Sequence, residues 1–245
     1  MFKQIKWRWR FFVDFFNLSR CKNKIEFNRY ALTHDERIAI EDIVKNRSPD
    51  ENARRTGRND YIALLDFLNL NVYDKDVLEL GPGWGDFLDL AKERGSHSTS
   101  FVDYHPYYFH YCRLNGHQGY KNDYFSNGAF KNVPKRRYDL ILSKGSINAD
   151  RFERQFDGGF RKISFSKWLD RLEDLARPNA MVIICPTYDL GFDMSKPYAY
   201  TDYPFGRRHM FEYLISCGYQ IHTDIKGFSH KDYFPFTFIK KVRKF

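Results

Sequence analysis

The sequence is poor in cysteine and has no long hydrophobic run. Its four cysteines are widely separated and form no C-x-x-C pair, so they predict free thiols rather than a disulfide framework. Free thiols are typical of a reducing compartment, and we expect the protein to be cytoplasmic. The most apolar stretches are about seven residues long, whereas a membrane-spanning helix needs about 20. The sequence therefore predicts neither a disulfide scaffold nor an integral membrane protein.

Histidine spacings typical of metal sites are also missing. The eight histidines contain no H-x-x-x-H or H-E-x-x-H pattern, so we expect no metal ion. Aromatic residues, by contrast, make up 18% of the 245 residues, and this much apolar area excludes an intrinsically disordered chain. The length fits one α/β domain with appendages.

The net charge of +9 is concentrated near the two ends of the sequence. Residues 1–30 carry +6 and residues 226–245 carry +5, so the remaining 195 residues sum to −2. Because the body is almost neutral, we do not expect nucleic acid to be a partner. The first 17 residues combine basic and aromatic side chains, which favours a helix that packs on the main domain or on a second subunit of a homodimer. A peripheral contact with an anionic membrane surface is the alternative.

Hydrophobic periodicity divides the chain into an N-terminal helical extension over 1–58 and a main domain over 59–245. Helices over 1–17 and 33–46 and a polar loop up to residue 58 form the predicted extension. In the main domain, helices are expected over 59–70, 86–94, 106–114, 165–176 and 206–216. Strands are expected over 77–80, 99–103, 117–121, 138–143, 180–185, 219–226 and 234–242. This alternation predicts an α/β fold with a mostly parallel seven-stranded sheet, helices on both faces and an antiparallel last strand.

A glycine-rich turn, Gly-Pro-Gly-Trp-Gly over 81–85, directly follows the first predicted strand. Such a turn lets a nucleotide approach the backbone. Two phosphate sites are excluded. Asp86 stands where a dinucleotide fingerprint needs its third glycine, and Phe87-Leu88 stand where a P-loop counted from Gly81 needs Lys and Ser or Thr. Glu79 inside the strand would repel a pyrophosphate and suits a ligand that bears positive charge.

The run Val77-Leu-Glu-Leu-Gly-Pro-Gly-Trp-Gly85 resembles the first motif of class I S-adenosylmethionine-dependent methyltransferases, (V/L)-L-(E/D)-hydrophobic-G-x-G-x-G. The resemblance covers roughly residues 60–243. It implies a Rossmann-like fold, methyltransferase activity, and S-adenosylmethionine as the cofactor with S-adenosylhomocysteine as the product. It also implies that Glu79, Gly81, Gly83 and Gly85 form the cofactor turn.

Further residues fall where this family places cofactor contacts. Asp103 ends the second strand 22 residues after Gly81, and the resemblance implies that it holds both ribose hydroxyls. Tyr104 would pack on the adenine face, or else in the core. Asp123 would contact the adenine amino group, or else lie on the surface. The segment 138–143 resembles the fourth-strand motif and would bring Ser143 to the cofactor.

The residues after the fourth strand indicate the class of acceptor. Family members that methylate base amines or glutamine amides carry (N/D/S)-P-P-(Y/F) there, whereas this chain has Ser-Lys-Gly-Ser-Ile-Asn-Ala-Asp over 143–150. This departure argues against base N-methylation. The segment 185–209 is rich in Tyr, Asp and Thr, which suit sugar hydroxyls, and its Arg207 and Arg208 can bind a phosphate. The pattern resembles bacterial O-methyltransferases that act on a sugar or sugar nucleotide in surface polysaccharide biosynthesis, so we expect a small-molecule acceptor.

An alcohol acceptor needs a proton acceptor near the transferred methyl group. Asp189, just after the fifth strand, is our candidate general base, with Thr187 and Tyr188 orienting the acceptor hydroxyl. His105 is the second candidate, although its place close to Asp103 favours a contact with the cofactor.

Two other functions stay open at this stage. One is an RNA or protein methyltransferase that grips its substrate with the basic termini. The other is a catalytically silent partner subunit that keeps the fold. This alternative stays open because Asn148 stands where small-molecule members of the family often have a histidine.

Overall fold

The computed structural model describes residues 51–147, 163, 165–186, 207–223, 225–227 and 237–242. The two helices expected over 1–17 and 33–46, and most of the segment 185–209, lie outside the described residues. In the described part, no helix combines the length and the apolar character that crossing a bilayer requires.

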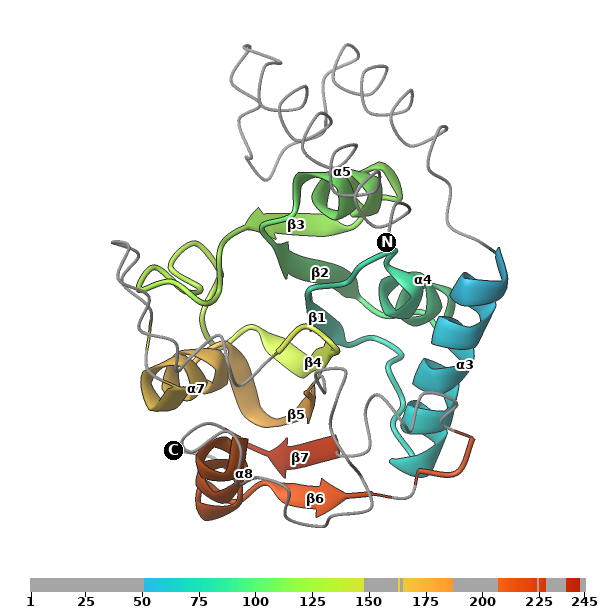
Figure 1. The fold of residues 1–245 in the computed structure, drawn as a ribbon. Coiled ribbons are helices and arrows are strands. Elements are labelled where there is room, and N and C mark those ends of the chain that lie inside the picture. The colour runs from blue at the N-terminus through green and yellow to red at the C-terminus, as the bar shows by residue number, and fades with distance from the viewer. Residues whose placement is uncertain are drawn as a thin grey trace, which may run out of the picture.

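The described strands form one seven-stranded sheet with the order β3-β2-β1-β4-β5-β7-β6 (Figure 1). Neighbouring pairs among the first five strands of this order are parallel, whereas β7 is antiparallel to both β5 and β6. The predicted α/β fold with a mostly parallel seven-stranded sheet is thus confirmed. The strands are β1 (Asp76–Leu80), β2 (Ser98–Asp103), β3 (Gln118–Lys121), β4 (Tyr138–Lys144), β5 (Ala176–Cys185), β6 (Gln220–His222) and β7 (Thr237–Lys241).

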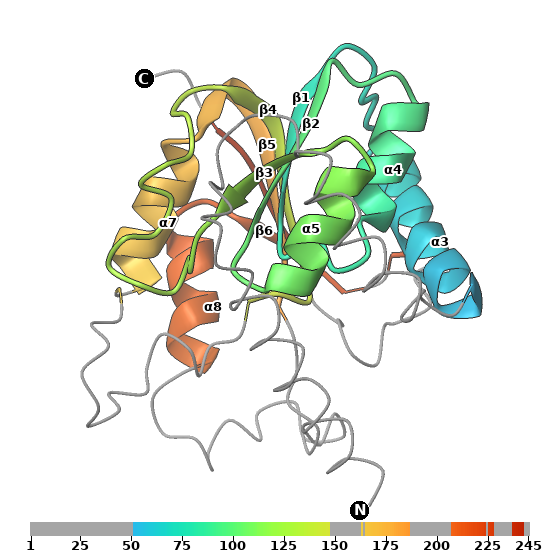
Figure 2. The same ribbon diagram turned by 90° about the horizontal axis from the view of Figure 1, so that it is seen from above.

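Helices cover both faces of this sheet (Figure 2). One face carries α3 (Glu51–Phe67), α4 (Asp86–Glu93) and α5 (Pro106–Leu114), and the other carries α7 (Phe165–Glu173) and α8 (Arg207–Ser216). Two clusters of buried side chains fill the two interfaces. Alternation along β1 explains the division, because Val77 belongs to the cluster under α3 and α4, while Leu78 and Leu80 belong to the cluster under α7 and α8.

Strand β1 lies in the middle of the parallel part, and all its residues are buried. Leu80 pairs with Val102 of β2 on one side and with Ser143 of β4 on the other. The segments that follow β1, β2 and β4 therefore leave the sheet at the same edge. In open α/β sheets, this carboxyl edge is where ligands bind.

Helix α3 is longer than the sequence predicts. It begins at Glu51, so the expected loop up to residue 58 is wrong for residues 51–58, and the expected domain boundary falls inside this helix. Arg58 forms an ion pair with Glu93 of α4, which ties the polar first turns of α3 to the domain. Gly57 lies inside this helix, and a Cβ atom at this position would lie 3.0 Å from Asp86 Oδ2. The glycine lets α3 approach the start of α4 closely.

Strand β5 also extends beyond its predicted range, beginning at Ala176 instead of residue 180, and α7 ends correspondingly early. The carbonyl of Leu175 accepts the amides of Arg137 and Tyr138, which holds this part of the chain on β4. The side chain of Arg177 then forms ion pairs with Asp76 and with a carboxylate of β4. Strand β6 covers only 220–222 of the predicted 219–226.

Candidate cofactor and active site

A cavity of about 310 Å³ lies at the carboxyl edge of the parallel strands. Four chain segments line it: the glycine turn after β1, the end of β2 with the start of α5, the segment after β3, and the loop after β4. The lining residues are Gly81, Gly83, Asp103, Tyr104, His105, Tyr108, Tyr124, Phe125, Gly145 and Ser146. The structure thus brings the predicted glycine turn together with Asp103, Tyr104 and His105.

The glycines of the turn have left-handed backbone conformations, with φ of +62° at Gly81 and +54° at Gly83. A Cβ atom on Gly81 would lie 2.4 Å from Ser146 Cβ and 2.9 Å from Tyr124 Oη, so this position must be glycine for the turn to contact the loop after β4. A Cβ atom on Gly83 would meet no atom of the described residues within 4 Å. The backbone at Gly83 is therefore open to a ligand.

Asp103 presents a buried carboxylate to the cavity from the end of β2. Its side chain is 4% exposed, and its Oδ1 accepts a hydrogen bond of 2.7 Å from the backbone amide of His105. Burial raises the pKa of Asp103 to about 7, although hydrogen bonds from the amides of His105 and Tyr104 act in the opposite direction. A carboxylate at this place can accept hydrogen bonds from ligand hydroxyls.

Glu79 lies in β1, two residues before the first glycine of the turn, on the face that α3 covers, and is 1% exposed. Its Oε1 accepts a hydrogen bond of 2.9 Å from the hydroxyl of Tyr61, while its buried Oε2 has no hydrogen-bond partner among the described residues. Burial raises the pKa of Glu79 well above its usual value, and the Tyr61 hydroxyl lowers it again in part. An unpaired buried carboxylate oxygen is costly unless a ligand supplies a donor. Glu79 therefore fits a ligand with a cationic donor group.

Aromatic side chains form one wall of the cavity. Tyr104 is 44% exposed and is one of the lining residues. The ring of His105, the residue that precedes α5, lies 4.7 Å from that of Tyr108, measured between ring centroids. Tyr108 in turn contacts Trp84 of the glycine turn edge to face at 5.3 Å. This wall offers flat apolar surface to a ring, so adenine stacking on Tyr104 stays a prediction that the geometry permits.

Ser143 does not line the cavity itself. It is 1% exposed, and its Oγ lies 2.7 Å from Oγ of Ser146, a lining residue. The Ser146 hydroxyl also donates to the carbonyl of Leu80 at 2.7 Å, which joins the loop after β4 to the end of β1. Ser143 thus supports Ser146, and its own contact with a cofactor stays a prediction.

Asp123 stabilises a turn beside the cavity. Its exposed side chain accepts the amide of Phe125 at 3.0 Å, and this turn leads into the lining residues Tyr124 and Phe125. A contact between Asp123 and adenine stays a prediction.

The predicted acceptor residues Thr187, Tyr188 and Asp189 lie outside the described residues. Helix α8 begins at Arg207, but the side chains of Arg207 and Arg208 are not among those described. The general base and the acceptor contacts therefore stay predictions.

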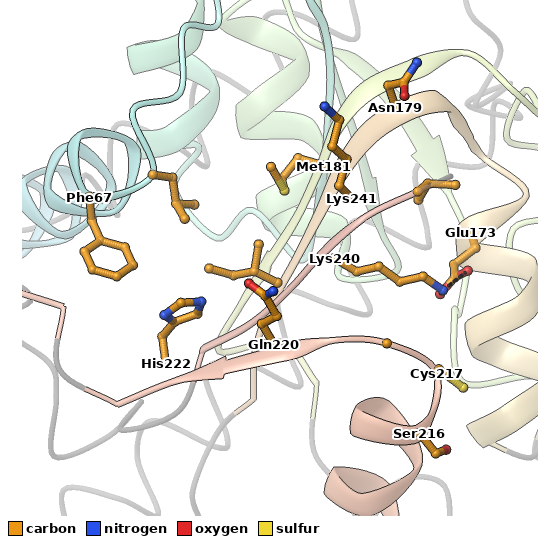
Figure 3. A pocket seen from close by; sticks show the side chains of 14 residues that line it. Phe67, Glu173, Asn179, Met181, Ser216, Cys217, Gln220, His222, Lys240 and Lys241 are labelled. Carbon is orange, nitrogen blue, oxygen red and sulfur yellow. Dashed lines mark hydrogen bonds and ion pairs between the residues drawn. The ribbon is translucent and has the colours of Figure 1, made fainter. Parts of the chain in front are cut away.

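A larger hollow of about 890 Å³ lies at the opposite end of the sheet (Figure 3). Figure 3 shows Phe67 of α3 facing His222 of β6, and the Lys240–Glu173 ion pair on the other side of the hollow. The centroids of the Phe67 and His222 rings are 5.3 Å apart. The lining of this larger hollow includes Asn179 and Met181 from the first half of β5. None of the residues that surround the glycine turn belongs to this hollow. The smaller cavity is therefore our candidate site.

Sequence reasoning did not single out Tyr61, Tyr108, Tyr124 or Phe125. Tyr61 is one aromatic residue of an amphipathic helix, and no spacing marks it as the partner of Glu79, which lies 18 positions further on. Ser146 belongs to the segment after the fourth strand that predicts the acceptor class, so position alone could have indicated it.

Neither the protein-family models nor the curated protein sequences contain a match to this chain. Solved structures do match. A protein from Methanococcus maripaludis, assigned as an S-adenosylmethionine-dependent methyltransferase, is 12% identical over 91% of this chain and 97% of its own, with a TM-score of 0.50. A methyltransferase with the same cofactor from Aquifex aeolicus is 15% identical over 82% and 96% of the two chains, also with a TM-score of 0.50. At these identities the likeness concerns the fold, which is the Rossmann-like methyltransferase fold that the first motif implies.

Proposed function

We propose that the protein is an S-adenosylmethionine-dependent methyltransferase. The observation that carries this proposal is the pairing of an open glycine turn with two buried carboxylates, Glu79 and Asp103. One oxygen of Glu79 has no hydrogen-bond partner in the part of the chain that the structure describes. An adenosine with an amino-acid tail offers hydroxyl donors for one carboxylate and an ammonium group for the other. When bound, this cofactor supplies an electrophilic methyl group on a sulfonium.

The chain's own residues would bind and orient this ligand. Asp103 would accept hydrogen bonds from the ribose hydroxyls, because it faces the cavity from the strand end. Glu79 would accept a hydrogen bond from the ammonium group. Tyr104 and Tyr108 would pack on the base, and the open backbone at Gly83 would let the ligand lie against the turn. The reaction then depends on positioning, exclusion of water and removal of the acceptor's proton.

For the acceptor, we propose a hydroxyl of a sugar or sugar nucleotide. The support is the composition of residues 185–209, where aromatic side chains alternate with short polar ones and two arginines follow. The near-neutral charge of the domain body also argues against RNA. We place the reaction in the cytoplasm, because Cys112, Cys185 and Cys217 in the described part are free thiols.

Two measurements test this function. Calorimetry should detect binding of S-adenosylmethionine and S-adenosylhomocysteine, and no binding of either would refute the methyltransferase proposal. A cofactor-consumption assay over a panel of sugar nucleotides, RNA and protein then tests the acceptor. Turnover with sugar nucleotides supports the proposal, whereas turnover with RNA alone, sensitive to salt, would overturn the sugar acceptor but not the activity.

Deletion of residues 1–17 is expected to leave the affinity for S-adenosylmethionine unchanged within about threefold, because all the proposed cofactor contacts follow residue 78. Calorimetry on the truncated and complete chains checks this. Binding that is ten times weaker would show that this segment belongs to the cofactor site.

Replacement of Asp189 by asparagine is expected to lower kcat by ~100-fold while the cofactor affinity stays nearly constant, the size typical of lost general-base assistance. Asp193→Asn in the same segment is the matched control and should keep most of the wild-type kcat. If Asp189→Asn retains more than about a third of kcat, Asp189 is not the base, and His105 becomes the next candidate.

A further inference from the structure

Helix α3 places two polar side chains, Asp60 and Tyr61, against the buried ends of β1 and β4. Asp60 Oδ2 forms an ion pair of 2.9 Å with Lys144 Nζ, and the two side chains are 0% and 7% exposed. Lys144 directly precedes the cavity residues Gly145 and Ser146. Because a buried ion pair is tolerated only with good geometry, this pair fixes Lys144 relative to α3.

The ring of Tyr61 is held from two sides. The ammonium of Lys144 lies 4.6 Å from its centroid, a cation–π distance, and the ring of Phe87 lies 5.4 Å away. Tyr61 is 7% exposed, and its hydroxyl donates to Glu79 Oε1 at 2.9 Å. The ring environment thus sets the position of the hydroxyl, and the hydroxyl sets the position of one oxygen of Glu79.

Charged and titratable groups from every neighbouring element act on Glu79. The negative charges of Asp86 and Asp103 raise the pKa of Glu79, as burial does, whereas the Tyr61 hydroxyl and the charge of Lys144 lower it. The buried thiol of Cys112 on α5 is also close enough for Glu79 to raise its pKa. Tyr61 and Lys144 are therefore the groups that favour the ionised form of Glu79.

We propose that Tyr61 is a positioning residue for the cofactor: its hydroxyl holds Oε1 of Glu79 so that Oε2 can accept a hydrogen bond from the cofactor's α-ammonium group. This inference rests on the proposed function. The ammonium group fits better than the sulfonium, because no described residue donates a hydrogen bond to Oε2 and a sulfonium has no N–H to donate.

The test is the substitution Tyr61→Phe, which removes the hydroxyl and keeps the ring. Calorimetry compares S-adenosylhomocysteine, which has the α-ammonium, with 5′-methylthioadenosine, which has the same nucleoside but no amino-acid tail. We expect Tyr61→Phe to weaken binding of S-adenosylhomocysteine about tenfold, which is the size of one lost charge-assisted hydrogen bond. Binding of 5′-methylthioadenosine should weaken less than twofold.

The pH profile gives a second readout. The ionised form of Glu79 binds the ammonium. The affinity for S-adenosylhomocysteine divided by that for 5′-methylthioadenosine should therefore fall as the pH drops through the pKa of Glu79. Loss of the Tyr61 hydroxyl raises this pKa, so the fall should begin at a higher pH in Tyr61→Phe. The ratio removes the contribution of Asp103, because both ligands carry the ribose.

Two controls make the result decisive. Tyr138→Phe, a buried tyrosine of the cluster on the opposite face, should change neither affinity. In a Glu79→Gln background, Tyr61→Phe should cost less than twofold, because the two residues act as one unit. Equal weakening of both ligands by Tyr61→Phe, or no weakening of either, would overturn the role of Tyr61. Failure of the wild-type protein to bind either ligand would instead refute the proposed function.

Discussion

Replacement of Asp103 by alanine is expected to weaken binding of S-adenosylmethionine by about 2 to 4 kcal/mol, or ~30- to 1,000-fold, because two charge-assisted hydrogen bonds to the ribose are lost. Calorimetry measures the effect. Asp66→Ala, an exposed carboxylate of α3, is the matched control and should leave the affinity unchanged. Unchanged affinity in Asp103→Ala would refute the ribose contact.

The pH dependence of binding checks the same assignment. Burial raises the pKa of Asp103 to about 7, and the carboxylate form is the better acceptor for two hydroxyls. Affinity for the cofactor should therefore fall as the pH drops below about 7, and this component should vanish in Asp103→Asn. For the protein without ligand the sign is opposite: because this pKa is raised above the unfolded value of about 4, Asp103 destabilises the fold progressively as the pH rises from about 4 to 7.

The substitution Gly81→Ala is expected to lower the free energy of unfolding by about 3 kcal/mol and the Tm by ~10 °C. Two causes add: the left-handed φ of +62°, which strains alanine, and a Cβ atom only 2.4 Å from Ser146 Cβ. Differential scanning calorimetry measures the change.

Gly83→Ala is the matched variant in the same turn. Its φ of +54° strains alanine by about 1 kcal/mol, but its Cβ atom would meet nothing within 4 Å in the described part of the chain. We therefore expect a Tm loss of only ~3 °C together with cofactor binding at least tenfold weaker, because the methyl group enters the proposed ligand space. Equal losses of Tm in the two variants would contradict the contact between Gly81 and the loop after β4.

The fold was predictable where short apolar segments, which indicate strands, alternate with segments of helical periodicity, which indicate helices. Strands β1, β2 and β4 start and end within a residue of their predicted limits, because each contains a short buried apolar segment that the sequence shows directly. The errors occur at polar stretches. The first turns of α3 and the first residues of β5 are held by ion pairs of Arg58 and Arg177, and such partners, far away in the sequence, leave no local pattern.

The candidate site was predictable to the same extent. Glu79 and the glycine turn belong to one continuous motif, and Asp103 ends the next strand. The spacing of these residues therefore identifies them. Tyr61 reaches Glu79 only because α3 packs across β1, and Ser146 replaces Ser143 at the cavity only because the loop after β4 turns back toward Leu80. Contacts of this kind depend on the packing of whole elements.

The position of β7 between β5 and β6 has a consequence for biosynthesis. Strands β1 to β5 precede β7 in the chain and can pair with one another as they emerge, but the outer edge of β5 stays unpaired until residues 237–241 have been made. At ~5–20 residues per second this interval lasts several seconds. An apolar strand with a free edge is a template for pairing with another chain. A nascent chain of this protein is therefore most exposed to aggregation in that interval, and a chaperone that protects it would act on Ala176–Cys185.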